Sequence, residues 1–149
     1  MKALKMNTLT KRIFLGIFTL MLLFSVESQA KNYKFLTSTV VPAARGFAKI
    51  NRDNNRNYVI KLKLTNLAEV QRLDPSKLSY VVWMVTDREE TKNIGQVDSS
   101  TKFMSKKLKA SFETVSSFTP TQIFITTEDD ASVQYPGNQV VLTTNKFTN

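Results

Sequence analysis

The stretch Ser79-Tyr80-Val81-Val82-Trp83-Met84-Val85-Thr86 decides the fold. Seven of its eight residues are β-branched, aromatic or otherwise apolar, and it contains no charged residue, glycine or proline. A short run that is apolar on both alternating faces is typical of a strand buried on each side. A buried helix is disfavoured because crowded valine, threonine and aromatic side chains lose rotamer freedom against a helical turn. Polar, turn-forming segments bound the run at 74–77 and 87–90. We therefore expect a central strand over Ser79–Thr86.

Other segments carry the alternation of strands with one wet face. Residues 58–66 show it most clearly, because Ile60, Leu62 and Leu64 fall on one side and Lys61 and Lys63 on the other. Such a strand favours antiparallel pairing. Further strands are predicted at 35–41, 45–51, 93–98, 104–112, 122–127 and 139–144. The first two of these could be one strand bent at 41–43, and residues 67–73 could form two helical turns.

The predicted elements indicate one fold class. Seven or eight closely spaced strands, with turn residues between them and no long helix, are typical of an all-β, antiparallel β-sandwich of the immunoglobulin-like kind. We expect Trp83 to be a core pillar between the two sheets, rather than an exposed ring for carbohydrate stacking, because buried aromatic side chains dominate cores.

The first thirty residues have the three parts of a signal peptide. A basic leader precedes a fourteen-residue apolar run at 13–26, which contains one glycine and two hydroxyl residues, and Ser28-Gln29-Ala30 offers small residues for cleavage. Fourteen helical residues span about 21 Å, which is short of the roughly 30 Å of a membrane core. We expect residues 1–30 to be a cleaved signal peptide and residues 31–149 to be a single exported domain, periplasmic or extracellular. Contact with the membrane is then expected only through the signal peptide before cleavage.

The charge balance suggests the kind of partner. The chain has a formal net charge of +9, and loss of a leader with four basic residues and one acidic residue leaves +6. Export removes nucleic acid as an expected partner and leaves an envelope protein or an anionic envelope polymer. Five lysines could gather on a wet sheet face and bind polyanions, although protection of sheet edges is the favoured reason for them. These are Lys61, Lys63, Lys106, Lys107 and Lys109.

The absence of histidine and cysteine removes most catalytic and metal chemistry. Zinc, copper, haem and iron–sulfur sites draw mainly on these residues, and so do the common nucleophile–base pairs. We therefore expect no cofactor and no catalysis. The alternative is a small envelope hydrolase that uses a pair of carboxylates, with Asp98, Glu113 and the acidic triplet at 128–130 as candidates.

The late loop at 128–138 contains two candidate binding features. Glu128, Asp129 and Asp130 could bind Ca²⁺. A solvated turn is favoured, because the alternating Asp and Asn ligands of a calcium loop are missing. Tyr135, Pro136 and Gly137 form a possible ligand loop, since binding residues often lie on loops at one end of a sandwich.

Two pieces of the chain together resemble a known family. Tyr80-Val81-Val82-Trp83-Met84 with Ile94-Gly95-Gln96-Val97, and Ile125-Thr126-Thr127-Glu128 with the segment 135–142, resemble the extracytoplasmic C-terminal domain of anti-sigma-K factors. The resemblance covers roughly residues 80–144 and implies a β-sandwich outside the inner membrane. It does not imply sigma-factor control, because the family's zinc-binding histidine and cysteine are absent. The chain also has Glu128-Asp129-Asp130 where the family commonly has Gly-rich turn residues.

These observations predict an exported, non-catalytic β-sandwich that acts as a binding or interaction module of the bacterial cell envelope. The alternatives are the carboxylate-dependent hydrolase and a structural accessory subunit of an envelope complex.

Overall fold

The computed structural model of the protein describes residues 30–97 and 109–147. The expected signal peptide, apart from Ala30, and residues 104–108 of one predicted strand lie outside these ranges. Eight strands and one short 3-10 helix make up the described part: β1 (Lys31–Lys34), β2 (Arg45–Arg52), β3 (Tyr58–Thr65), η1 (Val70–Arg72), β4 (Ser79–Thr86), β5 (Thr91–Val97), β6 (Lys109–Ser116), β7 (Pro120–Glu128) and β8 (Val140–Thr143). Within the described ranges, no helix has the length and apolar character needed to cross a membrane.

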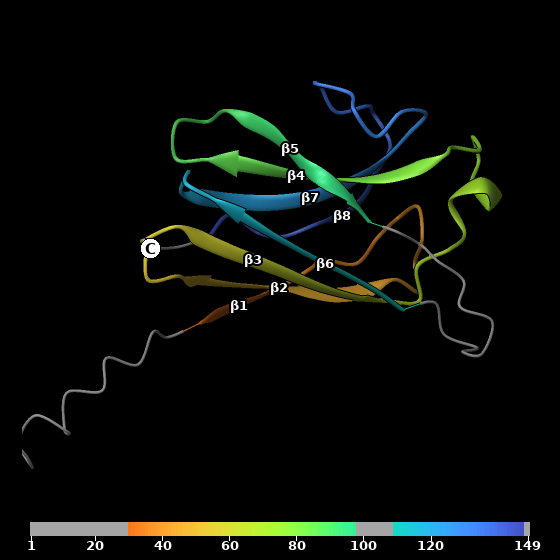
Figure 1. Ribbon diagram of the computed structural model, residues 1–149. Coiled ribbons are helices and arrows are strands. Elements are labelled where there is room, and N and C mark those ends of the chain that lie inside the picture. Colours follow the sequence, from red (N-terminus) through yellow and green to blue (C-terminus); the bar gives the residue numbers. More distant parts are fainter. Residues whose placement is uncertain (1–29, 98–108, 148–149) are drawn as a thin grey trace, which may run out of the picture.

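The strands form two four-stranded sheets that lie one above the other (Figure 1). The first sheet has the order β1-β2-β3-β6 and the second has the order β5-β4-β7-β8. Every paired strand runs antiparallel to its neighbour. The all-β class and the two-layered antiparallel architecture are as predicted, and they are consistent with a β-sandwich.

The core lies between the two sheets and takes one face from each. β3 contributes Ile60, Leu62 and Leu64, while β4 contributes Tyr80 and Val82, all at most 1% exposed. Full burial of one such side chain stabilises the fold by about 1.5–3 kcal/mol. The prediction that Ile60, Leu62 and Leu64 face the core is therefore confirmed. The prediction of a central strand over Ser79–Thr86 that is buried on both faces is confirmed as well.

The prediction that Trp83 lies between the sheets is wrong. Trp83 is fully buried, but it does not belong to the core shared by the sheets, whereas its neighbours Val82 and Met84 do. Because side chains alternate along a strand, Trp83 lies on the outer face of the second sheet. There the chain between β7 and β8 turns back over the sheet (Figure 1), so a position that would otherwise face water is dry.

The strand predicted at 35–41 is also wrong. β1 ends at Lys34, and Phe35 makes only an isolated bridge to Thr144. The chain then passes from one sheet to the other, because the Phe35 N–H donates to Gly46 in β2 while the Leu36 N–H donates to Thr143 in β8. A further local bond, from the Val41 N–H to the Ser38 hydroxyl at 2.9 Å, favours a turn over a ladder.

Candidate binding face

The outer face of the first sheet gathers half of the exposed cations in the described part of the chain into one surface. We call it the basic face, and its positions follow from the pairing of β1, β2, β3 and β6. Three cross-strand rows make it up. The first is Arg45, Thr65 and Lys109; the second is Lys34, Phe47, Lys63 and Ser111; the third is Asn32, Lys49, Lys61 and Glu113.

The charges on the basic face are strongly unbalanced. Six of its eleven residues are lysine or arginine, and Glu113 is the single acid among them. Lys61 and Glu113 form an ion pair at 2.8 Å with both side chains about half exposed, so the pair contributes at most about 1 kcal/mol. Lys49 stands directly opposite Lys61, and like charges in that position repel each other. An anion bound here would relieve this repulsion.

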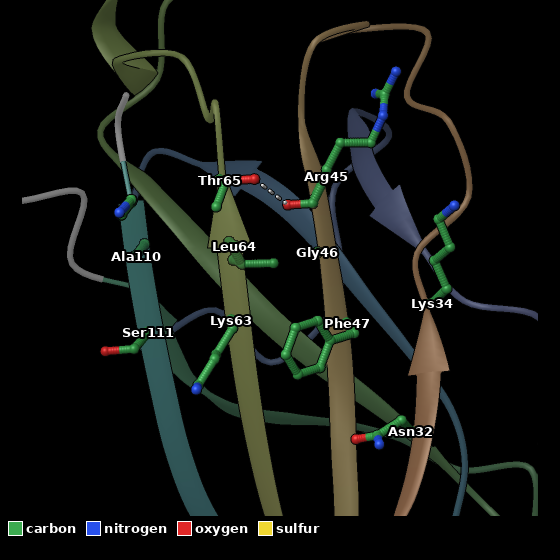
Figure 2. Close-up of a pocket in the computed structure, with 11 residues that line it drawn as sticks. Asn32, Lys34, Arg45, Gly46, Phe47, Lys63, Leu64, Thr65, Ala110 and Ser111 are labelled. Atoms are coloured by element: carbon green, nitrogen blue, oxygen red, sulfur yellow. Dashed lines mark hydrogen bonds between the residues drawn. The ribbon is translucent and has the colours of Figure 1, made fainter. Parts of the chain in front are cut away.

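A shallow hollow lies over the first two rows of the basic face. Its volume is about 840 Å³. Figure 2 shows Phe47 and Lys63 side by side on neighbouring strands, with Arg45 and Lys34 at the rim. The Arg45 guanidinium is held by its Nη1, which donates to the carbonyl groups of Pro42 and Ala44 at 2.6 Å each. The hollow thus combines an aromatic ring with one guanidinium held in place and exposed lysines.

The sequence favoured protection of sheet edges as the reason for the five lysines on wet strand faces. This prediction is wrong for two of them. Lys61 and Lys63 belong to β3, which pairs with β2 on one side and β6 on the other, so they protect no edge. Lys109 lies on β6, an edge strand of the first sheet. Lys106 and Lys107 lie outside the described residues.

The structure gives the three acidic residues after β7 separate partners. The buried Glu128 accepts bonds from the Thr126 hydroxyl at 2.5 Å and the Gly137 N–H at 2.7 Å. Asp129 pairs with Lys77 at 2.6 Å. The backbone N–H and the hydroxyl of Ser132 both donate to Asp130, which lowers the pKa of that carboxyl. Within the ranges that the structure describes, no three His, Cys, Asp or Glu residues come together as a metal site.

The possible ligand loop divides between the surface and the interior. Tyr135 is 84% exposed, whereas Gly137 packs against the Glu128 carboxylate. The same loop is tied to β5 by Asn93, whose amide donates to the carbonyl groups of Ala131 at 2.9 Å and Val133 at 2.8 Å. Asn93 is the cross-strand partner of Trp83, so these bonds hold the loop at the outer face on which Trp83 lies.

The carboxylates of the alternative hydrolase do not meet in the structure. Glu113 is on the outer face of the first sheet, where it pairs with Lys61. Ile125 of β7 belongs to the core between the sheets. Because successive side chains point to opposite faces of a strand, Glu128, three residues further along β7, lies on the outer face of the second sheet. A glycosidase needs its two carboxyl groups within about 10 Å across one cleft, and these two face away from each other. Asp98 lies outside the described residues.

Sequence reasoning missed several members of the basic face. The alternation at 45–51 puts Arg45, Phe47 and Lys49 on one side of that strand, and the Asn-rich segment 51–57 predicts a hairpin to the strand carrying Lys61 and Lys63. The set of five lysines expected on a wet sheet face nevertheless did not include these outward residues. Lys34 was missed altogether, because the strand was expected to begin at residue 35. The hairpin predicted around 51–57 is confirmed, because β2 and β3 pair antiparallel on either side of it.

Comparisons with protein-family profiles, with curated proteins and with solved structures each found no match to this chain. The resemblance of residues 80–144 to the anti-sigma-K domain stays a prediction.

Proposed function

We propose that this protein is an exported, non-catalytic binding module of the bacterial cell envelope that holds an anionic envelope ligand on its basic face. The observation that carries the proposal is the set of six cations against one carboxylate on the outer face of the first sheet. A surface of one charge sign attracts oppositely charged ligands over distances of about a Debye length, roughly 8 Å at physiological salt.

The placement of these cations on paired strands supports a binding role over a purely solubilising one. Solubility is served by charges of both signs spread over a surface, whereas here three lysines and one arginine surround a single hollow. Lys49 and Lys61 are held opposite each other by the ladder between β2 and β3. The ladder therefore fixes the spacing of the strand positions from which these two side chains extend.

We further propose that the two sheets are immunoglobulin-like. If β2, β3, β4, β5, β6, β7 and β8 are named A, B, C, C′, E, F and G, the sheets read A-B-E and C′-C-F-G, with β1 added at one edge. Many exported and cell-surface binding domains use sandwiches of this kind. The signal peptide expected at 1–30 supports the same placement outside the cytoplasm.

The experiment compares two double variants of equal charge. Lys49→Glu with Lys63→Glu removes two cations from the basic face, while Arg72→Glu with Arg88→Glu makes the same charge change at exposed positions beside β4. The protein is purified from a bacterium that expresses the full chain and is titrated with polyglutamate. We expect the first variant to bind at least tenfold more weakly and the second to stay within about threefold of the unsubstituted protein. Equal losses in the two variants would contradict the proposal, and thermal unfolding checks that both are folded.

A further inference from the structure

The basic face contains an exposed aromatic ring at its centre. Phe47 is 39% exposed, and its cross-strand neighbours are Lys34 on β1 and Lys63 on β3. Phe47 therefore lies between the strand positions of two lysines in the second row, and Figure 2 shows both lysine side chains extending away from the ring. A flat ring flanked by cations offers two kinds of contact together: a surface on which an apolar or sugar ring can lie, and charges on either side of it.

The hollow beside Phe47 has the size of a ligand site, and its lining is mainly apolar with a few polar groups. Its volume of about 840 Å³ falls within the roughly 300–1,000 Å³ of small-molecule pockets. Thr65, Ser111 and Asn32 line it as well, so hydroxyl and amide groups lie among the cations. Hydroxyl-rich ligands need such partners, because each polar group that loses water must recover a hydrogen bond.

The spread of the cations exceeds what one small anion can reach. From Arg45 to Lys49 the strand rises about 13 Å, and from β1 to β6 three strand spacings cover about 14 Å. Lys34 and Lys109 therefore lie on opposite edge strands of the basic face, farther apart than the width of one small anion. A ligand that uses the whole basic face must carry several negative charges along its length.

We infer that the basic face binds an acidic polysaccharide, with one sugar ring on Phe47 and the anionic groups of neighbouring sugars at Lys34 and Lys63. This inference rests on the proposed function and names its ligand class. Single-stranded nucleic acid is disfavoured because such strands stack successive bases on several aromatic rings, and Phe47 is the single aromatic residue of the basic face as the structure describes it. A membrane surface is disfavoured because Phe47 is more than half covered and is the one large apolar side chain of the basic face as defined by its three rows.

The test separates the ring from the charges. The protein purified from cells expressing the full chain is titrated at one salt concentration with polygalacturonate and alginate, which are acidic sugar polymers, and with polyglutamate, which has carboxylates but no sugar. We expect the sugar polymers to bind at least tenfold more tightly per charge than polyglutamate. Phe47→Ala and Phe47→Leu should abolish that preference while polyglutamate binding stays within twofold, and Phe47→Tyr should keep it.

Each other outcome counts against a stated part of the account. Equal binding of sugar polymers and polyglutamate, or a preference that survives in both Phe47→Ala and Phe47→Leu, would overturn the polysaccharide inference and leave the proposed function standing. Tighter binding of oligothymidylate or of phosphatidylglycerol vesicles would also overturn it. If no polyanion binds and the Lys49→Glu, Lys63→Glu variant behaves like the unsubstituted protein, the proposed function itself fails.

Discussion

At the scale of single residues, the hydroxyl of Thr126 joins two buried groups. It accepts a bond from Trp83 Nε1 at 2.8 Å and donates to Glu128 Oε1 at 2.5 Å. Thr126→Val keeps the shape of the side chain but removes the hydrogen-bond partner of the indole N–H, while Glu128 Oε1 keeps only the bond from the Gly137 N–H. We expect the free energy of unfolding to fall by about 1–3 kcal/mol, measured by urea denaturation.

Thr91→Val is the matched control for this change. Thr91 is exposed at the start of β5, so the same substitution should change the free energy of unfolding by less than about 0.5 kcal/mol. If Thr126→Val were as harmless as the control, the three-residue network would not stabilise the covered face of the second sheet.

Tyr80 links stability to alkaline pH. Burial raises the pKa of its phenol from 10.0 to about 12, and its hydroxyl donates to the Ala68 carbonyl at 2.9 Å. Between pH 10 and pH 12 the unfolded chain releases the phenol proton while the folded chain retains it, so the free energy of unfolding falls as pH rises. We expect this one group to cost about 2 kcal/mol across that interval.

Tyr80→Phe isolates the effect, because the lysines titrate alike in both proteins. The unsubstituted protein should be the more stable at pH 8, and its advantage over the variant should shrink between pH 10 and pH 12. Guanidinium denaturation at several pH values measures the difference. A constant difference across this range would show that the phenol ionises equally easily in the folded chain.

At the scale of elements, strands with strong alternation or full burial could be predicted from sequence. β3, β4 and β7 were found because Ile60, Leu62 and Leu64 alternate cleanly, and because the runs over Ser79–Thr86 and 122–127 are apolar on both faces. The strand expected at 35–41 does not form. Its β-branched residues favour an extended backbone, but they do not determine whether a neighbouring strand is available to pair with it. Ser38 instead bonds locally and Phe35 bridges to Thr144.

The position of Trp83 could not be predicted for a related reason. Both faces of β4 are buried, and its sequence does not show which of the two faces packs against the other sheet. The answer depends on the loop between β7 and β8, which is held over the outer face by Asn93 and Glu128. The sequence of this loop has no hydrophobic periodicity, so its path over the outer face of the sheet could not be predicted.

Gly95 determines how β5 packs against the first sheet. Its φ is 131°, and a Cβ at this position would lie 2.9 Å from the Phe112 ring of β6. Gly95→Ala therefore combines a strained backbone with a clash, and we expect the free energy of unfolding to fall by about 1–3 kcal/mol. Differential scanning calorimetry measures the change. Gln96→Ala, an exposed neighbour in the same strand, is the control and should lie within about 0.5 kcal/mol of the unsubstituted protein.

At the scale of the whole molecule, the basic face depends on strands that are distant in the sequence. Lys34 and Lys109 come from β1 and β6, and only the strand order brings them to the same side as Lys63. Charge counting before the structure gave a mildly basic domain and a general expectation of anionic partners. Register and strand order then concentrate that charge on one surface, which composition cannot reveal.

Salt should weaken ligand binding to this surface far more than to an uncharged one. Because several exposed cations act together, we expect the affinity for polygalacturonate to fall at least tenfold between 50 mM and 300 mM NaCl. Isothermal titration at four salt concentrations gives the slope. The Lys49→Glu, Lys63→Glu variant should show a shallower slope, and the Arg72→Glu, Arg88→Glu variant should keep the original one. Identical slopes in all three proteins would place the binding charges elsewhere.

The most direct test of the proposed function is to map where a polyanion touches the molecule. Backbone amide signals of the isotopically labelled protein are assigned by NMR and followed during a titration with short galacturonate oligomers. We predict that the shifts concentrate on β2 and β3, around Phe47, Lys49 and Lys63, and spare β7 and β8 of the second sheet. Shifts concentrated on the second sheet or its covering loop would contradict the assignment of the basic face as the binding surface.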